Sequence, residues 1–216
     1  MNSRLWIWLV ALGATSQALP QEFEAGTHYR VVSSAAQPTS PGVGTVELAE
    51  FFQYGCHACL SLEPQLERWL AEDKPDHVRF TRVHVTWNPQ ARLHAQAYYA
   101  AEALGKSEEM HAAFFDEIHK AGNSLDTVDK LAEFFARFSV ARDDFTNAFN
   151  SFAVDTKLKR ADELTRRLRV SGTPTIVVNG KYSTDGPMAG SYRNWFAILE
   201  QLIAAEGAGR EPQGEP

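Results

Sequence analysis

The stretch EFFQYGCHAC at 50–59 joins a strand pattern to a helix pattern and holds both cysteines of the chain. Residues 45–52 (TVELAEFF) predict a β-strand that ends just before the first cysteine. Residues 61–72 carry apolar side chains at helical spacing, and another strand pattern follows at 78–85. The sequence therefore predicts a strand–helix–strand unit with the two cysteines at the strand-to-helix junction.

A cysteine pair at the start of a helix is suited to redox chemistry. A thiol in the first turn faces free backbone N–H groups and the positive end of the helix dipole, and both favour the thiolate. We therefore predict that Cys56 is an acidic, exposed nucleophile and that Cys59, one turn later, is the resolving thiol. A stabilised thiolate is also a good leaving group, so the oxidised form should readily pass on its disulfide.

Two other interpretations of the cysteine pair are half of a zinc site and an inert structural disulfide. A zinc site needs two more ligands at suitable spacing. The sequence has no second cysteine pair, and its seven histidines never follow one another at the three-to-five-residue interval of zinc ligands. We therefore favour a redox pair and expect no metal.

Three residues near the cysteines are candidates for supporting roles. His57 could stabilise the neighbouring thiolate as a hydrogen-bond donor, or it could simply face solvent. Glu50 alternates with apolar residues on its strand, so we expect a buried carboxylate with a raised pKa unless a cation satisfies it. Arg82, on the following strand, is the candidate cation. The pair could relay protons to Cys59 or form a structural ion pair, and both possibilities stay open.

The remainder of the chain is helical and then returns to strands. Five apolar stripes at helical spacing run from Asn88 to Leu168, and their aromatic residues predict core packing. A strand at 175–178 follows, and a last helix is predicted after Ser191. Pro174 opens that strand, a position where the peptide bond is normally trans.

The N-terminus has the pattern of an export signal. Leu5 to Ala14 is an almost wholly apolar run, too short to span a bilayer comfortably, and small residues precede a cleavage position after Ala18. An uncleaved N-terminal anchor is the alternative. The chain has 216 residues and a net charge of −6 without a long basic run, which argues against nucleic acid as a partner.

Four segments in matching order resemble the DsbA family of bacterial thiol:disulfide oxidoreductases: EFFQYGCHAC at 50–59, GTPTIVVNGKY at 172–182, NSF at 150–152 and FEAGTHY at 23–29. The resemblance implies an α/β architecture, a thioredoxin fold interrupted by an all-helical insertion domain. The corresponding boundaries are a signal peptide at 1–18, thioredoxin segments at 19–86 and 154–206, the insertion at 87–153 and a disordered tail at 207–216.

The resemblance also implies roles and partners. Cys56 would exchange disulfides with substrate, Pro174 would be cis and lie beside the disulfide, and Thr173 would offer backbone groups to an extended substrate. Glu50 and Arg82 match the family's acid–base pair. The expected partners are unfolded, cysteine-containing exported proteins and a quinone-linked membrane protein of the DsbB type that reoxidises the enzyme. The enzyme itself would be a monomer in the periplasm and would need no cofactor.

Two positions depart from the best-known family members. His57-Ala58 stands where those members have Pro-His, and Thr173 stands where they have Val. Both positions tune the thiolate, so a disulfide isomerase or a reductant of the same superfamily remains an alternative to a disulfide donor. A periplasmic zinc-binding or chaperone-like module is the alternative from a different class.

Overall fold

The computed structural model describes residues 22–32 and 44–207. Its centre is a mixed five-stranded sheet in the order β1-β5-β4-β2-β3. In chain order the strands are β1 (Arg30–Val31), β2 (Val46–Phe52), β3 (Val78–His84), β4 (Thr175–Val178) and β5 (Tyr182–Asp185). β2 pairs in parallel with β3 and antiparallel with β4, so β2 is the strand through which both halves of the chain meet.

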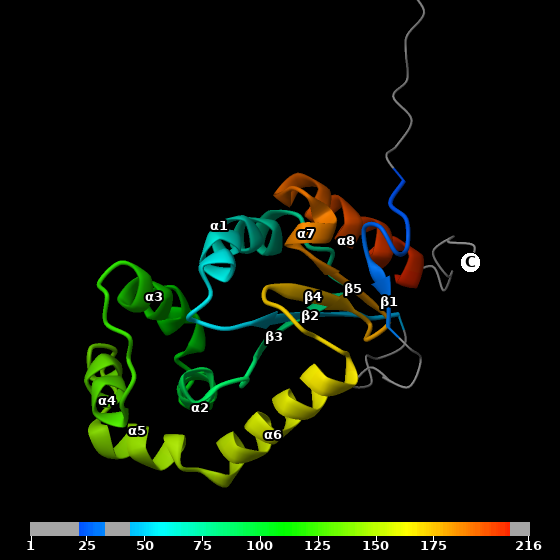
Figure 1. The fold of residues 1–216 in the computed structure, drawn as a ribbon. Coiled ribbons are helices and arrows are strands. Elements are labelled where there is room, and N and C mark those ends of the chain that lie inside the picture. The colour runs from blue at the N-terminus through cyan, green and yellow to red at the C-terminus, as the bar shows by residue number, and fades with distance from the viewer. Residues whose placement is uncertain (1–21, 33–43, 208–216) are drawn as a thin grey trace, which may run out of the picture.

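Eight helices surround the described sheet (Figure 1). They are α1 (His57–Glu72), α2 (Pro89–Ala103), α3 (Ser107–His119), α4 (Val128–Ala136), α5 (Arg142–Phe149), α6 (Phe152–Arg167), α7 (Gly186–Ala189) and α8 (Tyr192–Gly207). Figure 1 shows α1, α7 and α8 over one face of the sheet and α6 across the other, with α2 to α5 gathered to one side.

The alternation of side chains along β2 builds two cores. Leu48 packs with residues of α1 and α8 on one face, and Phe51 packs toward α6 and the helical side of the molecule on the other. The predicted aromatic stripes are confirmed as core for Phe114, Phe135 and Phe145, which are all buried in the second cluster, but the prediction is wrong for Phe152, which is 83% exposed at the start of α6. The insertion is thus attached to the sheet through a continuous apolar core rather than through a linker.

The predicted strand–helix–strand unit is confirmed. Three details of the predicted secondary structure differ, one in this unit and two near the C-terminus. The first helix begins at His57, directly after Cys56, rather than near residue 61. The single-turn helix α7 was not predicted, because four residues are too few to show a helical period. Gly207 belongs to α8 and not to the expected tail. The predicted signal peptide and the rest of that tail lie outside the described residues.

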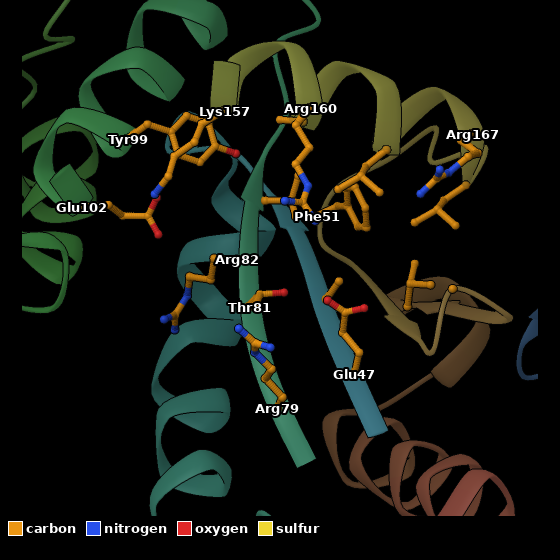
Figure 2. Close-up of a pocket in the computed structure, with 17 residues that line it drawn as sticks. Glu47, Phe51, Arg79, Thr81, Arg82, Tyr99, Glu102, Lys157, Arg160 and Arg167 are labelled. Atoms are coloured by element: carbon orange, nitrogen blue, oxygen red, sulfur yellow. The ribbon is translucent and has the colours of Figure 1, made fainter. Parts of the chain in front are cut away.

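A cleft of about 390 Å³ lies between α6 and the sheet (Figure 2). Arg160 reaches from α6 toward Phe51 on β2, and Arg79 and Glu47 lie farther along the same face. Neither cysteine lines this cleft. In the part of the chain that the structure describes, no helix combines the length and apolar character needed to cross a membrane.

Candidate active site

The two cysteines lie at the N-terminus of α1, as the sequence predicts. A tight turn leads from β2 into the helix, closed by the N–H of Cys56, which donates to the Gln53 carbonyl at 3.1 Å. Cys56 is the N-cap residue, and its Sγ accepts the backbone N–H of Cys59 at 3.2 Å. Cys56 is half-buried, whereas Cys59 is fully buried, and both are free thiols. The Cys56 sulfur is therefore accessible to a partner, and the Cys59 sulfur is shielded from solvent.

The two thiols differ strongly in acidity. Hydrogen bonds from the Cys59 thiol, the Thr173 side chain and the backbone N–H groups of Cys59 and Ala58 lower the pKa of Cys56 to about 6, against the opposing effect of burial. Burial, reinforced by the neighbouring Cys56 sulfur, raises the pKa of Cys59. At neutral pH Cys56 is thus mostly thiolate, and the remaining thiol proton stays on Cys59.

The loop before β4 faces the exposed thiol. The Thr173–Pro174 peptide bond is cis, so the trans bond that general frequencies favour is wrong here and the cis bond implied by the resemblance is confirmed. The Thr173 carbonyl oxygen lies 3.3 Å from Cys56 Sγ. A groove of about 300 Å³ opens beside this contact, lined by Ala58, Gly172, Thr173, Pro174, Asp185, Gly186, Pro187, Tyr192 and Trp195.

The predicted pair of Glu50 and Arg82 is present beneath the cysteines. The two residues are directly opposite in the β2–β3 register, and Arg82 Nε lies 3.2 Å from Glu50 Oε2, though without the alignment of a hydrogen bond. Burial and the nearby Glu63 carboxylate raise the pKa of Glu50 to about 8, despite Arg82. The expectation was a raised pKa unless a cation satisfied the carboxylate; the cation is present, yet burial still raises the pKa, so Glu50 can hold or release a proton near neutral pH.

The ion pair extends to residues that sequence reasoning missed. Arg82 Nη2 lies 3.1 Å from Glu63 Oε2 and also contacts Glu67, and His111 Nε2 lies 3.1 Å from Glu63 Oε1. Although burial opposes it, His111 and Arg82 keep the pKa of Glu63 below its usual range. The sequence did carry a sign of Glu63, because it follows Cys59 by four residues and so shares the buried face of the helix.

His57 does not lie as expected. Its side chain is exposed, and among the described residues its ring makes no hydrogen bond with either sulfur. Instead it meets the ring of His119 edge-on, with 4.4 Å between ring centroids. The expectation of direct donation from His57 to a thiolate is therefore not met in this structure.

Within residues 22–32 and 44–207, no group of three or more His, Cys, Asp or Glu side chains is placed to hold a metal ion.

A pair of thiols one helical turn apart, one acidic and half-buried and the other fully buried and weakly acidic, meets the requirements of dithiol exchange. The fold that carries the pair is a thioredoxin fold with a helical insertion, and the protein is a thiol:disulfide oxidoreductase. Residues 47–194 match the family model of the DSBA-like thioredoxin domain, and the chain belongs to the DsbA family.

Similar proteins cover almost the whole chain. The thiol:disulfide interchange protein DsbA of Azotobacter vinelandii is 35% identical over 199 residues, which span 92% of each chain. The corresponding protein of Pseudomonas aeruginosa is 33% identical over 91% of this chain and 90% of its own. The crystal structure of P. aeruginosa DsbA matches with a TM-score of 0.80 at 33% identity, covering 87% of this chain and 96% of that one. The oxidoreductase DsbA of Xylella fastidiosa gives a TM-score of 0.78 at 32% identity, over 85% and 97% of the two chains.

Proposed function

We propose that the protein donates a Cys56–Cys59 disulfide to newly exported, cysteine-containing proteins. A substrate thiolate attacks Cys56 Sγ, the Cys56–Cys59 bond breaks, and Cys59 leaves as a thiolate that takes up a proton. A second substrate thiolate then attacks the substrate sulfur of the mixed disulfide and expels Cys56 as its thiolate. The substrate is oxidised by two electrons and the protein is reduced by two.

The observation that carries this proposal is the position of Cys56 at the N-terminus of α1, where its Sγ accepts the Cys59 N–H at 3.2 Å and its pKa is lowered by these hydrogen bonds. A thiolate that is stable in the reduced protein is a good leaving group, and its stability favours passing the disulfide on. The N–H groups of the α1 N-terminus and the Thr173 side chain stabilise the thiolate. A neutral thiol would not gain this stabilisation.

In our proposal, Glu50 supplies the proton that Cys59 takes up when it leaves as a thiolate. Glu50 has a raised pKa of about 8, and its charge acts on Cys59. A carboxyl group that titrates near neutral pH suits general acid–base work. Arg82 would keep Glu50 from becoming a permanently neutral acid, because its guanidinium favours the charged carboxylate.

Substrate would lie along the groove beside the cis-proline. Its lining is largely apolar, and Thr173 carries the backbone groups that an extended chain could meet beside Cys56. We infer a monomeric enzyme that acts in the periplasm after cleavage of the signal peptide near Ala18. A DsbB-type, quinone-linked membrane protein would reoxidise it.

The test is the equilibrium of the protein with reduced and oxidised glutathione, followed by tryptophan fluorescence. A potential of about −120 mV would support a disulfide donor, since that is the region of DsbA-type oxidants. A value below about −200 mV would contradict donation and favour an isomerase or reductant, in line with Thr173 before the cis-proline. Stoichiometric zinc binding by the reduced protein would instead favour a metal-binding module.

A further inference from the structure

Tyr54 lies in the turn that presents Cys56, and three histidines hold it. Its backbone N–H donates to His84 Nε2 at 3.2 Å, its carbonyl is 2.7 Å from His119 Nε2, and its hydroxyl is 3.0 Å from His111 Nδ1. All three polar groups of this buried residue are thus satisfied by imidazole rings. His84 comes from β3, whereas His111 and His119 come from α3 of the helical insertion.

The partners define which ring nitrogens carry protons. A carbonyl oxygen can only accept, so His119 Nε2 must donate to Tyr54. His84 Nε2 accepts the Tyr54 N–H, and its Nδ1 donates to the Val85 carbonyl at 2.8 Å. His84 is therefore neutral, in agreement with burial, which lowers its pKa to about 3. The Tyr54 backbone thus donates one hydrogen bond to His84 and accepts one from His119. Together these bonds fix the peptide units on both sides of the residue.

His119 also reaches the cysteine motif itself. It is the last residue of α3, and its ring meets the His57 ring edge-on at 4.4 Å between centroids. Phe115, one turn earlier on α3, lies nearly parallel to the His119 ring. Figure 1 shows α3 beside the start of α1. One side chain of the insertion therefore touches both the turn before Cys56 and the residue after it.

We propose that His119 is a positioning residue for Cys56, through which the helical insertion sets the reactivity of the thiol. It orients the carbonyl of Tyr54 and so fixes residues 53–56, the turn that aims Cys56 Sγ at the N–H of Cys59. Its ring also orders His57. The proposal rests on the proposed function, because it concerns how strongly the reduced form is stabilised.

Two substitutions separate the parts of this contact. His119→Phe keeps an aromatic ring against His57 but removes the donor to Tyr54, whereas His119→Gln keeps a possible N–H donor and removes the ring. The matched control is His77→Phe, because His77 is an exposed histidine before β3 and takes no part in the contacts of Tyr54, His57 and His119. Thermal unfolding of each variant shows that it is folded, and His119→Gln carries the test if His119→Phe does not fold.

The measurements are the thiolate absorbance of Cys56 against pH and the equilibrium in which the protein disulfide oxidises two glutathione molecules. For His119→Phe we expect the titration midpoint to rise by about half a pH unit and the equilibrium constant to fall about threefold, since one pH unit corresponds to about tenfold. His119→Gln should show a smaller change in the same direction. Wild-type values in both His119 variants, or an equal change in His77→Phe, would overturn the proposal.

This outcome is separate from that of the proposed function. A wild-type protein that proves a weak oxidant contradicts disulfide donation. A further weakening in His119→Phe would nonetheless support the role of His119, because the comparison is between two variants of the same chain.

Discussion

The sulfur of Cys56 lies 3.3 Å from the carbonyl oxygen of Thr173, although 117 positions of sequence separate the two residues. The contact brings the N-terminus of α1 against the loop that opens β4. In the proposed function, a substrate that bonds to Cys56 would therefore lie beside Thr173, and the same few atoms would serve disulfide exchange and peptide binding.

The two cysteines should respond differently to substitution. Cys56→Ala removes the exposed sulfur, so we expect loss of disulfide exchange in an assay with a reduced peptide. Cys59→Ala leaves the acidic thiol without its resolving partner, so mixed disulfides with substrates should accumulate. Non-reducing electrophoresis of cells that express Cys59→Ala measures this. If Cys59→Ala captured nothing while the protein was present in normal amount, the dithiol mechanism would be wrong.

Stability of the reduced protein should depend on pH through Cys56. Its pKa is lowered from an ordinary thiol value to about 6 in the folded state, so the stabilisation is fully present above the unfolded pKa of about 8.5 and is lost as pH falls through about 6. The full difference would give roughly 3.4 kcal/mol, but Cys56 is half exposed to screening solvent, so we expect about 2 kcal/mol.

Urea unfolding at pH 8.5 and pH 5 measures this change, with the oxidised protein as the control. The disulfide form has no thiol, so the difference in unfolding free energy between the oxidised and reduced forms isolates Cys56 and Cys59 from all other groups; the raised pKa of Cys59 lowers stability only as pH rises toward 8.5 and so opposes the trend expected from Cys56. A difference that stays constant between the two pH values would contradict the lowered pKa.

Glu50→Gln should slow turnover while leaving the glutathione equilibrium nearly unchanged. Glutamine keeps the size of the side chain but cannot exchange a proton, so steps in which Cys59 gains or loses its proton should slow by at least about tenfold. The control is Glu47→Gln, on the same strand but the opposite face of the sheet. Equal turnover by Glu50→Gln and wild type would identify Glu50 as a purely structural partner of Arg82.

Arg82→Met should destabilise the protein because Arg82 contacts three carboxylates, those of Glu50, Glu63 and Glu67. Removing the cation leaves Glu63 as a buried charge, and we expect a loss of about 3 kcal/mol at pH 7. The pKa of Glu63 is lowered in the folded wild type, so its contribution is present above the unfolded pKa and declines at lower pH. The loss in Arg82→Met should therefore shrink at pH 4 in denaturant titrations, and an equal loss at both pH values would argue against this electrostatic cause.

Several features of the site could be predicted because they are local. The spacing of Cys56 and Cys59 follows from one helical turn, and the acidity of Cys56 follows from its place at a helix N-terminus. The Glu50–Arg82 pair followed from the alternation of side chains on adjacent strands, and the register of β2 and β3 confirms it.

Features that depend on long-range packing could not be predicted in this way. For His57 the sequence left open a hydrogen bond to the thiolate or a side chain that faces solvent; in the structure it is exposed, and the ring of His119 from the insertion meets it. The contacts that three histidines make with Tyr54 join β3, α3 and the active-site turn. A short-range sequence pattern does not predict contacts between elements so far apart in the chain.

The sequence by itself determined the class of chemistry, because a thiol's reactivity is set mainly by the first turn of the helix that carries it and by a second thiol within reach. Only the tertiary structure decided what surrounds that pair. The position of Thr173 at the sulfur and of His119 at the turn depend on how the insertion and the C-terminal strands pack against β2, and this packing is the sum of many apolar contacts across the whole chain.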